Sequence, residues 1–368
     1  MKSLLYSETS LYVEYTIICL LFVLIAYKSI EKRDKIVSDT LISLDVSNFL
    51  KALCCIVIIL HHYALRVHIL PTKSLWANFG GFFSLTCFII LSAYGITKVE
   101  LKNPANFVIF LKKRFLKIYI PVTITTILFI FVYLLIEADN ITVEDVLAAR
   151  GNAYFVLIGS KLAHWNDYLE MILLTDLIDG ALWYVQVTLI AYFIFFISKS
   201  FFPLTNRKLP FFILYSILIS ALFMFFYLFD FPPCYYMNLW GLIIGTGVAL
   251  YEKELLNKKI RSYIMVVFFS NLFLIPFFFW QKYLYHYLAS NISIISIFIL
   301  NEYFRSFTIK RDSLLLLLST LSLYIYLVHT KILTIEWYYC GFISVLFPIF
   351  VIVVLAYILY RIQHLILK

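Results

Sequence analysis

The chain has 368 residues, of which 63% are hydrophobic and only 14% are charged. About a quarter of the residues in a soluble domain are charged, so this composition excludes an ordinary soluble protein and predicts an integral membrane protein surrounded by membrane lipid. The net charge of +9 does not indicate a nucleic-acid partner, because the cations are divided among separate connections between apolar runs instead of forming one basic patch.

Apolar runs long enough to cross about 30 Å of hydrocarbon recur along the chain. We expect eleven membrane spans, at residues 11–29, 45–66, 79–97, 118–136, 182–198, 210–229, 238–251, 262–280, 287–304, 313–330 and 338–360. The run at 238–251 is short and contains Gly241, Gly245 and Gly247, which predicts a tilted or broken helix, or one packed closely against a neighbour. The predicted fold is an all-α, polytopic membrane bundle.

Basic residues fall in alternate connections between these runs, beginning with Lys32 and Arg33 and continuing with Lys112 and Lys113. Basic connections are cytoplasmic by the positive-inside rule, which predicts a plasma-membrane protein with its N-terminus outside and its C-terminus in the cytoplasm. The connection at about 137–181 is then external. It is long and mainly acidic, which favours a lid or binding loop. Glu14 lies near the external end of the first span and is expected to be solvated.

The six cysteines show no CxxC or Cys/His spacing that would predict a metal site. Four of them lie inside predicted spans and are interpreted as apolar packing residues: Cys19, Cys54, Cys55 and Cys87. Cys234 and Cys340 are both expected on the outer side, where they are placed to form a disulfide.

Two ionisable residues, Lys51 and His62, lie inside the apolar run at 45–66. Ionisable groups within a membrane helix are costly and mark functional sites. A separation of eleven helical residues brings the two side chains to nearly the same face, about 16 Å apart along the axis. A neutral imidazole can accept a proton from a hydroxyl at neutral pH. The adjacent His61 points about 100° away. Simpler interpretations remain, with Lys51 as a snorkelling anchor and His62 as an interfacial histidine.

The segment from Asn48 to His62 resembles the first core helix of the membrane-bound acyltransferase 3 family, whose signature is Arg or Lys, ten residues, then His. Lys51 and His62 match that signature. The next landmark is the segment 80–96, which is similar to a family helix rich in glycine and phenylalanine, with Ser92, Tyr94 and Gly95 at matching positions.

Three further landmarks follow in the family's order. Arg114 and Lys117 occupy the two positions of a basic stretch that ends in Tyr and Pro. Trp183 begins a Trp-Tyr motif, and Tyr324 to His329 resembles a Tyr-x-x-x-x-His motif. Together the landmarks cover about residues 45–335. The chain departs from the family pattern at four positions: Asn48 replaces Asp, Ala93 replaces Gly, and lysine replaces arginine at 51 and 117.

The resemblance implies a ten-helix acyltransferase core over residues 45–368, preceded by an extra span and a basic loop in residues 1–44. It implies acetyl-CoA as the cytoplasmic donor, no metal, and as acceptor a hydroxyl of a cell-envelope or capsular polysaccharide or its lipid-linked precursor. The implied catalytic residues are His62, as general base or transient acyl carrier, and Lys51. The implied coenzyme A contacts are Lys51, Arg114, Lys117 and Lys113, and the implied substrate-binding residues are Ser92, Tyr94, Trp183, Tyr324 and His329.

Other interpretations of these features stay open at this stage. The basic stretch also fits a topology signal, and the tryptophan and tyrosines fit an interfacial aromatic belt. A polysaccharide polymerase or flippase would have a similar number of spans but is expected to use external arginines, of which the 137–181 connection has only Arg150. A secondary transporter is expected to show related halves or paired broken helices. An acyltransferase scaffold that has lost catalysis is a further alternative.

Overall fold

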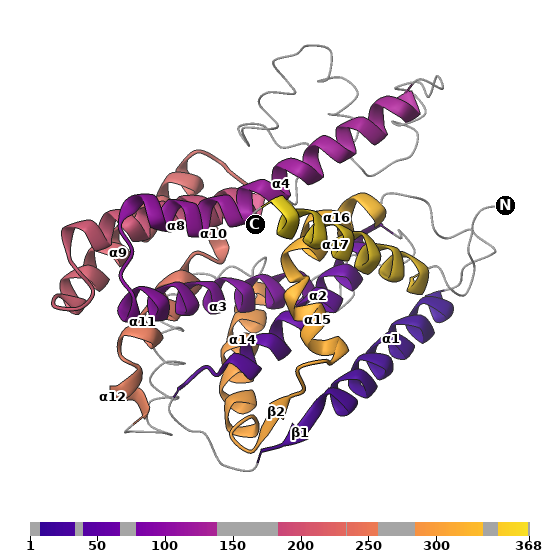
Figure 1. Cartoon of the computed structure of the whole chain (residues 1–368), viewed down its shortest axis with the longest axis horizontal. Helices are drawn as coiled ribbons and strands as arrows, with labels where there is room; N and C mark the ends of the chain where they lie inside the picture. Colours follow the sequence, from indigo (N-terminus) through magenta and orange to yellow (C-terminus); the bar gives the residue numbers. More distant parts are fainter. Residues whose placement is uncertain are drawn as a thin grey trace.

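The computed structural model describes residues 8–33, 40–66, 79–137, 183–232, 234–256, 284–333 and 345–366. These residues form a helical bundle (Figure 1), as the sequence predicts for a multi-pass membrane protein. The helices are α1 (Glu8–Ser29), α2 (Leu44–Arg66), α3 (Gly81–Lys102), α4 (Phe107–Glu137), α8 (Trp183–Phe201), α9 (Lys208–Leu228), α10 (Cys234–Met237), α11 (Trp240–Leu250), α12 (Glu252–Leu256), α14 (Leu284–Tyr303), α15 (Leu314–Thr320), α16 (Ser322–Leu333) and α17 (Leu346–Ile366).

Within the described residues, five helices are long and apolar enough to cross a membrane, or six if one bent pair counts as a single span. These findings confirm the membrane bundle but not the predicted number of eleven spans. The predicted span at 262–280 lies outside the described residues. The span expected at 118–136 is part of a longer helix, α4, which already includes the basic stretch.

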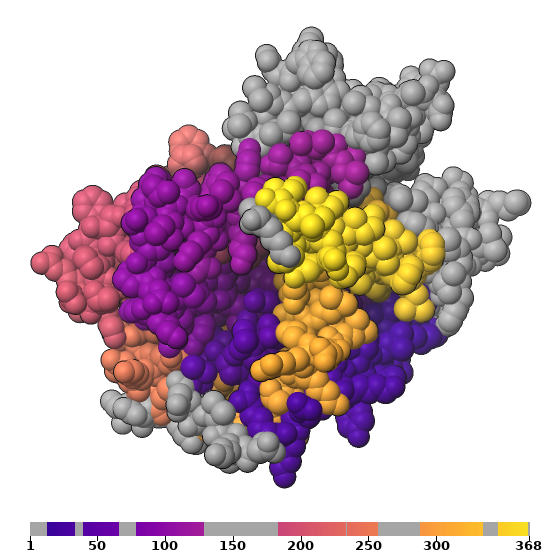
Figure 2. Space-filling view, viewed as in Figure 1, coloured from indigo at the N-terminus to yellow at the C-terminus, as the bar shows by residue number. Residues whose placement is uncertain are grey.

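The span expected at 313–330 is two helices, α15 and α16, which meet at an angle of 77°. The break falls at Leu321, between the two helices. α15 packs against α2, whereas α16 contacts α2, α4 and α17. In Figure 2, α4 and α17 lie side by side on one face of the molecule. The bend therefore lets the two halves of one apolar run pack against different parts of the bundle.

The predicted span at 238–251 is closely packed against a neighbour, one of the outcomes that its glycines indicated, and its helix is continuous through all three glycines. α10 ends at Met237 and α11 begins at Trp240. The contact between α11 and α3 is the most extensive between any two elements of the described chain. At its centre, a side-chain carbon added to Gly245 would overlap the carbonyl oxygen of Ile90 and lie 2.9 Å from Ala93 Cβ.

Gly245→Ala is expected to lower the thermal unfolding midpoint of the purified protein, because the added methyl group meets backbone that cannot move aside. Overpacking of this kind typically costs about 1–3 kcal/mol. Gly95→Ala is the control, since nothing lies within 4 Å of its added carbon. Equal midpoints for the two variants in detergent would show that α11 does not depend on this close approach.

The connection after α1 and the connection before α15 form a small antiparallel sheet. Strand β1 (Ile30–Lys32) pairs with β2 (Phe307–Ile309), with Ile30 opposite Ile309. Asp45, in the first turn of α2, forms an ion pair with Arg33 and accepts a hydrogen bond from the backbone N–H of Ile309 at 3.1 Å. Two basic connections that the charge pattern assigns to the same side of the membrane therefore lie side by side.

The extra N-terminal helix is an integral part of the bundle. α1 contacts α2 and α15, and the hydroxyl of Tyr15 donates to the carbonyl of Leu60 at 2.9 Å. The expectation that Glu14 is solvated is wrong. Its side chain is completely buried and accepts a hydrogen bond from the N–H of Val345 at 2.8 Å, where α17 begins. A carboxylate is stabilised at this position because the first N–H groups of a helix lack backbone partners and carry partial positive charge.

The cysteines described by the structure are free thiols, and those of α2 and α3 are buried, which agrees with their interpretation as packing residues. Cys340 lies outside the described residues, so its pairing with Cys234 stays a prediction.

Candidate functional site

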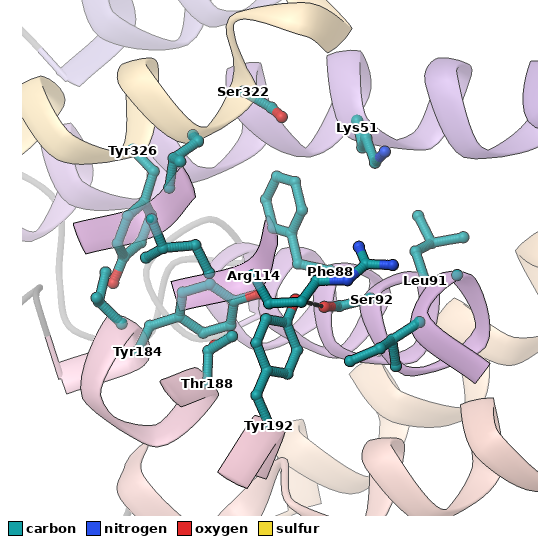
Figure 3. A pocket seen from close by; sticks show the side chains of 15 residues that line it. Lys51, Phe88, Leu91, Ser92, Arg114, Tyr184, Thr188, Tyr192, Ser322 and Tyr326 are labelled. Carbon is teal, nitrogen blue, oxygen red and sulfur yellow. Dashed lines mark hydrogen bonds between the residues drawn. The ribbon is translucent and has the colours of Figure 1, made fainter. Parts of the chain in front are cut away.

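A cavity of about 300 Å³ lies between α2, α3, α4, α8 and α16. Its wall combines apolar side chains with hydroxyl groups and two cations (Figure 3). The cations and hydroxyl-bearing side chains that line it are Lys51, Ser92, Arg114, Tyr184, Thr188, Tyr192, Ser322 and Tyr326. Five helices that are far apart in the sequence thus supply one site.

Lys51 of α2 and Arg114 of α4 both extend into this cavity (Figure 3). Neither makes an ion pair or a side-chain hydrogen bond with any residue that the structure describes. Nearby, Asn48 is engaged elsewhere, accepting a hydrogen bond from Ser319 at 3.0 Å. Burying a cation without a partner is costly. Two such cations in one cavity therefore predict an anionic ligand.

Two other half-buried lysines of the described bundle are already neutralised, unlike Lys51 and Arg114. Lys98 pairs with Glu252, and Lys199 pairs with Glu100. Glu252 also accepts a hydrogen bond from the backbone N–H of Leu41 at 2.7 Å. These carboxylates fix the ends of helices, so they are structural, whereas the two cavity cations are available to a ligand.

The wall contributed by α8 is a polar stripe. Tyr184, Thr188 and Tyr192 are spaced by four residues, which places them on one face of the helix. The hydroxyl of Tyr192 lies 2.8 Å from that of Ser92, which joins α8 to α3 across the cavity. Sequence reasoning did not select Thr188, Tyr192 or Ser322. The spacing of hydroxyl residues in an otherwise apolar helix was the signal that could have found the α8 stripe.

A cluster of imidazoles lies next to this cavity and continues it along α16. Tyr326 lines the cavity and packs edge-on against Tyr184, with ring centroids 5.3 Å apart. The ring of His329 is 5.6 Å from that of Tyr326 and 4.8 Å from that of His62. A chain of aromatic contacts therefore joins the cation-lined cavity to His62. Among the described residues, no three His, Cys, Asp or Glu side chains are grouped so as to hold a metal ion.

His61 and His62 have different surroundings, although their rings are only 4.9 Å apart. His61 packs against the start of α3, where a carbon added to Gly81 would lie 2.5 Å from its Nε2. His62 instead faces α16 and His329. The sequence prediction that His61 points about 100° away from His62 is consistent with this arrangement.

The model of the acyltransferase domain family matches residues 44–361 of the chain. The chain belongs to the membrane-bound acyltransferase 3 family. It is therefore a multi-pass membrane acyltransferase. The family match begins at the first residue of α2, so α1 lies outside it. No curated protein and no solved structure matches the chain at a significant level.

Within the acyltransferase, three of the sequence-predicted site residues line the cavity, and two more form the adjacent imidazole contact. Lys51, Arg114 and Ser92 are cavity residues, and His62 and His329 are in ring contact. The Lys51–His62 face expected from helical spacing therefore meets the cavity at one end and the imidazoles at the other.

The structure places the remaining predicted residues elsewhere in the acyltransferase. Tyr94 is hydrogen-bonded to Glu252, and Tyr324 to Gln363 on α17. Trp183 is buried against Tyr235, with ring centroids 5.7 Å apart.

The two lysines of the basic stretch also differ from Arg114. Lys113 and Lys117 are exposed, and neither lines the cavity. Arg114 is half-buried and turned inward. The coenzyme A role of the two lysines, and the substrate-binding roles of Tyr94, Tyr324 and Trp183, stay predictions.

Proposed function

We propose that this membrane acyltransferase moves an acetyl group from acetyl-CoA to a hydroxyl of a cell-envelope or capsular polysaccharide, or of its lipid-linked precursor. The observation that carries the proposal is the pair of unpartnered cations, Lys51 and Arg114, in one cavity that adjoins His62. Family membership favours this reaction over those of a polymerase, a flippase or a transporter.

The cavity suits the phosphates of coenzyme A. Arginine binds phosphate through two parallel charge-assisted hydrogen bonds, and lysine adds a compact point charge. The hydroxyls of Ser92 and Tyr192 lie in the same wall and offer further donors. With the phosphates held at Lys51 and Arg114, the extended pantetheine arm would carry the thioester along the helix toward His62, about 16 Å away.

His62 would act on the acceptor hydroxyl. One imidazole nitrogen takes the hydroxyl proton while the oxygen attacks the thioester carbonyl carbon. The new C–O bond forms, the C–S bond breaks, and coenzyme A leaves as a thiolate. The thiolate then takes the proton from the imidazolium, so His62 returns to its neutral form and no other reactant is needed.

The acceptor is proposed to approach from the outer side of the membrane. The basic connections support a donor entrance in the cytoplasm, and His62 lies four residues before the opposite end of α2. The acidic connection at 137–181 lies outside the described residues, and its proposed role as a cover over the glycan rests on its length and composition.

Envelope glycans from cells with and without the gene test the proposed function by mass analysis. We expect glycan masses to differ by one acetyl group per modified sugar, with the amount of glycan unchanged. A change in glycan amount with identical masses would instead support a polymerase, flippase or transporter.

The orientation can be tested with an impermeant thiol reagent on intact cells. A cysteine replacing the exposed Lys112 is expected to be shielded, because it belongs to a basic connection. A cysteine replacing Phe229, which is exposed at the other end of α9, is expected to react above the wild-type background. The reverse pattern would place the donor entrance on the outer side.

A further inference from the structure

Pro121 interrupts the backbone hydrogen bonding of α4 close to the cavity. A proline has no backbone N–H, and its ring clashes with the carbonyl four residues earlier, so it removes one helix hydrogen bond and allows a kink. In α4 that carbonyl belongs to Lys117. Lys117 lies about one helical turn from Arg114, which lines the cavity. The part of α4 that carries Arg114 therefore joins the rest of the helix at a weak point.

Gln363 of α17 supplies a hydrogen bond to this carbonyl. Its Nε2 donates to the carbonyl oxygen of Lys117 at 3.2 Å, and its Oε1 accepts from the hydroxyl of Tyr324 on α16. A carbonyl oxygen only accepts hydrogen bonds, which fixes the orientation of the amide. The side chains of Gln363 and Tyr324 are both buried, where an unmade hydrogen bond is costly. One amide thus links three helices that contact one another, α4, α16 and α17.

Two of these helices line the cavity. α4 supplies Arg114, and α16 supplies Ser322 and Tyr326, which lie on either side of Tyr324 in the chain. Tyr324 does not line the cavity, and its hydroxyl is directed to Gln363 instead. Gln363 itself lies outside the family match. The two hydrogen bonds of its amide therefore tie the helix of Arg114 to the helix of Tyr326.

We propose that Gln363 is a positioning residue for the donor site. By bonding the carbonyl that Pro121 leaves without its helix partner, it holds the segment of Arg114 against α16, where the guanidinium reaches the phosphates of coenzyme A. Tyr324 orients the amide of Gln363, which differs from the acceptor contact that its motif implied. The inference rests on the proposed function.

The position of this segment affects donor binding because arginine binds phosphate by two parallel hydrogen bonds, which need a defined orientation. A segment that can turn at Pro121 would present Arg114 correctly for only part of the time. The apparent affinity for a ligand falls in proportion to the fraction of protein in the binding conformation. Holding the carbonyl of Lys117 raises that fraction before acetyl-CoA arrives.

The test measures kinetics of the purified enzyme with acetyl-CoA and the isolated glycan. Gln363→Leu removes both hydrogen bonds at similar size, so KM for acetyl-CoA is expected to rise about tenfold. kcat and KM for the glycan should stay within about twofold, because only donor binding is weakened. Tyr324→Phe leaves the bond to Lys117 and should have a smaller effect. His364→Leu is the control, since His364 is the exposed neighbour of Gln363 on α17.

Pro121→Ala provides the decisive comparison. Alanine restores a backbone N–H that bonds the carbonyl of Lys117 within the helix, so Gln363 is no longer needed. In the Pro121→Ala background, Gln363→Leu should change KM for acetyl-CoA by less than about twofold. Hydrogen exchange of the amides at 108–117 needs no turnover. It should be faster in Gln363→Leu than in the wild type and slow again in the double variant.

Two results would overturn the inference. One is a lower thermal unfolding midpoint in Gln363→Leu with an unchanged KM for acetyl-CoA, which would leave Gln363 a structural role alone. The other is the same rise in KM with and without Pro121. A folded wild type that neither binds nor uses acetyl-CoA would count against the proposed function, whereas an active wild type with an unchanged donor KM in Gln363→Leu would count against this inference.

Discussion

His62→Ala is expected to lower acyl transfer by about 10²- to 10⁴-fold, the usual effect of losing a general base. This corresponds to roughly 3–5 kcal/mol in the activation barrier. The structure supports a specific loss, because His62 faces His329 next to the cation-lined cavity. Expression and membrane insertion should be close to normal, since removing a polar group from a membrane helix relieves a desolvation cost.

The matched control for this prediction is His61→Ala, which changes the same residue type one position earlier. His61 packs against the first turn of α3 rather than against α16, so its loss should leave most of the activity. Glycan acetylation in cells, normalised to the amount of enzyme in the membrane, measures both variants. Wild-type acetylation by His62→Ala, or equal losses in the two variants, would remove His62 from the proposed mechanism.

The second large effect is expected at the donor site. Arg114→Ala should reduce kcat/KM for acetyl-CoA by about 10- to 100-fold, because hydrogen bonds to charged groups contribute about 1.5–3 kcal/mol each. Arg114→Lys should retain part of this, as lysine keeps the charge but not the two parallel bonds. The acceptor KM should change little. Donor and acceptor titrations of purified enzyme separate the two effects.

Lys113→Ala is the control for the donor prediction. Lys113 is the neighbour of Arg114 and carries the same charge, but it is exposed and does not line the cavity. Its removal should affect acetyl-CoA use by less than about threefold, as is typical of a screened surface charge. Equal effects of Lys113→Ala and Arg114→Ala would mean that the basic stretch aids acetyl-CoA use through its total charge, and not through a contact that Arg114 makes in the cavity.

Several features of the site could be predicted from the sequence because they depend on one helix. The spacing of Lys51 and His62 is a property of α2 alone, and the structure places the two residues at the cavity and the imidazole contact. The glycines of α11 are a second local feature, since small residues allow helices to approach closely. Gly245 meets the backbone of α3 as expected.

Other features depend on packing between helices and could not be predicted. Tyr324 and Tyr326 are two residues apart, so they point about 200° apart on α16. The sequence motif selected Tyr324, but the structure turns it toward α17 and turns Tyr326 into the cavity. The bend at Leu321 had no sequence signal, because the predicted span contains no glycine or proline. Glu14 is buried because the start of α17 covers it, a contact between distant segments.

In the proposed function, an acyl group passes from a coenzyme A thioester, through the cavity and past His62, to a glycan across the membrane. The most direct test of this transfer is a sealed proteoliposome with labelled acetyl-CoA on the side of the basic connections and the glycan acceptor on the other side. We expect label on the glycan with the wild-type enzyme and almost none with His62→Ala. An unlabelled glycan in the presence of folded wild-type enzyme, or equal labelling by His62→Ala, would contradict it.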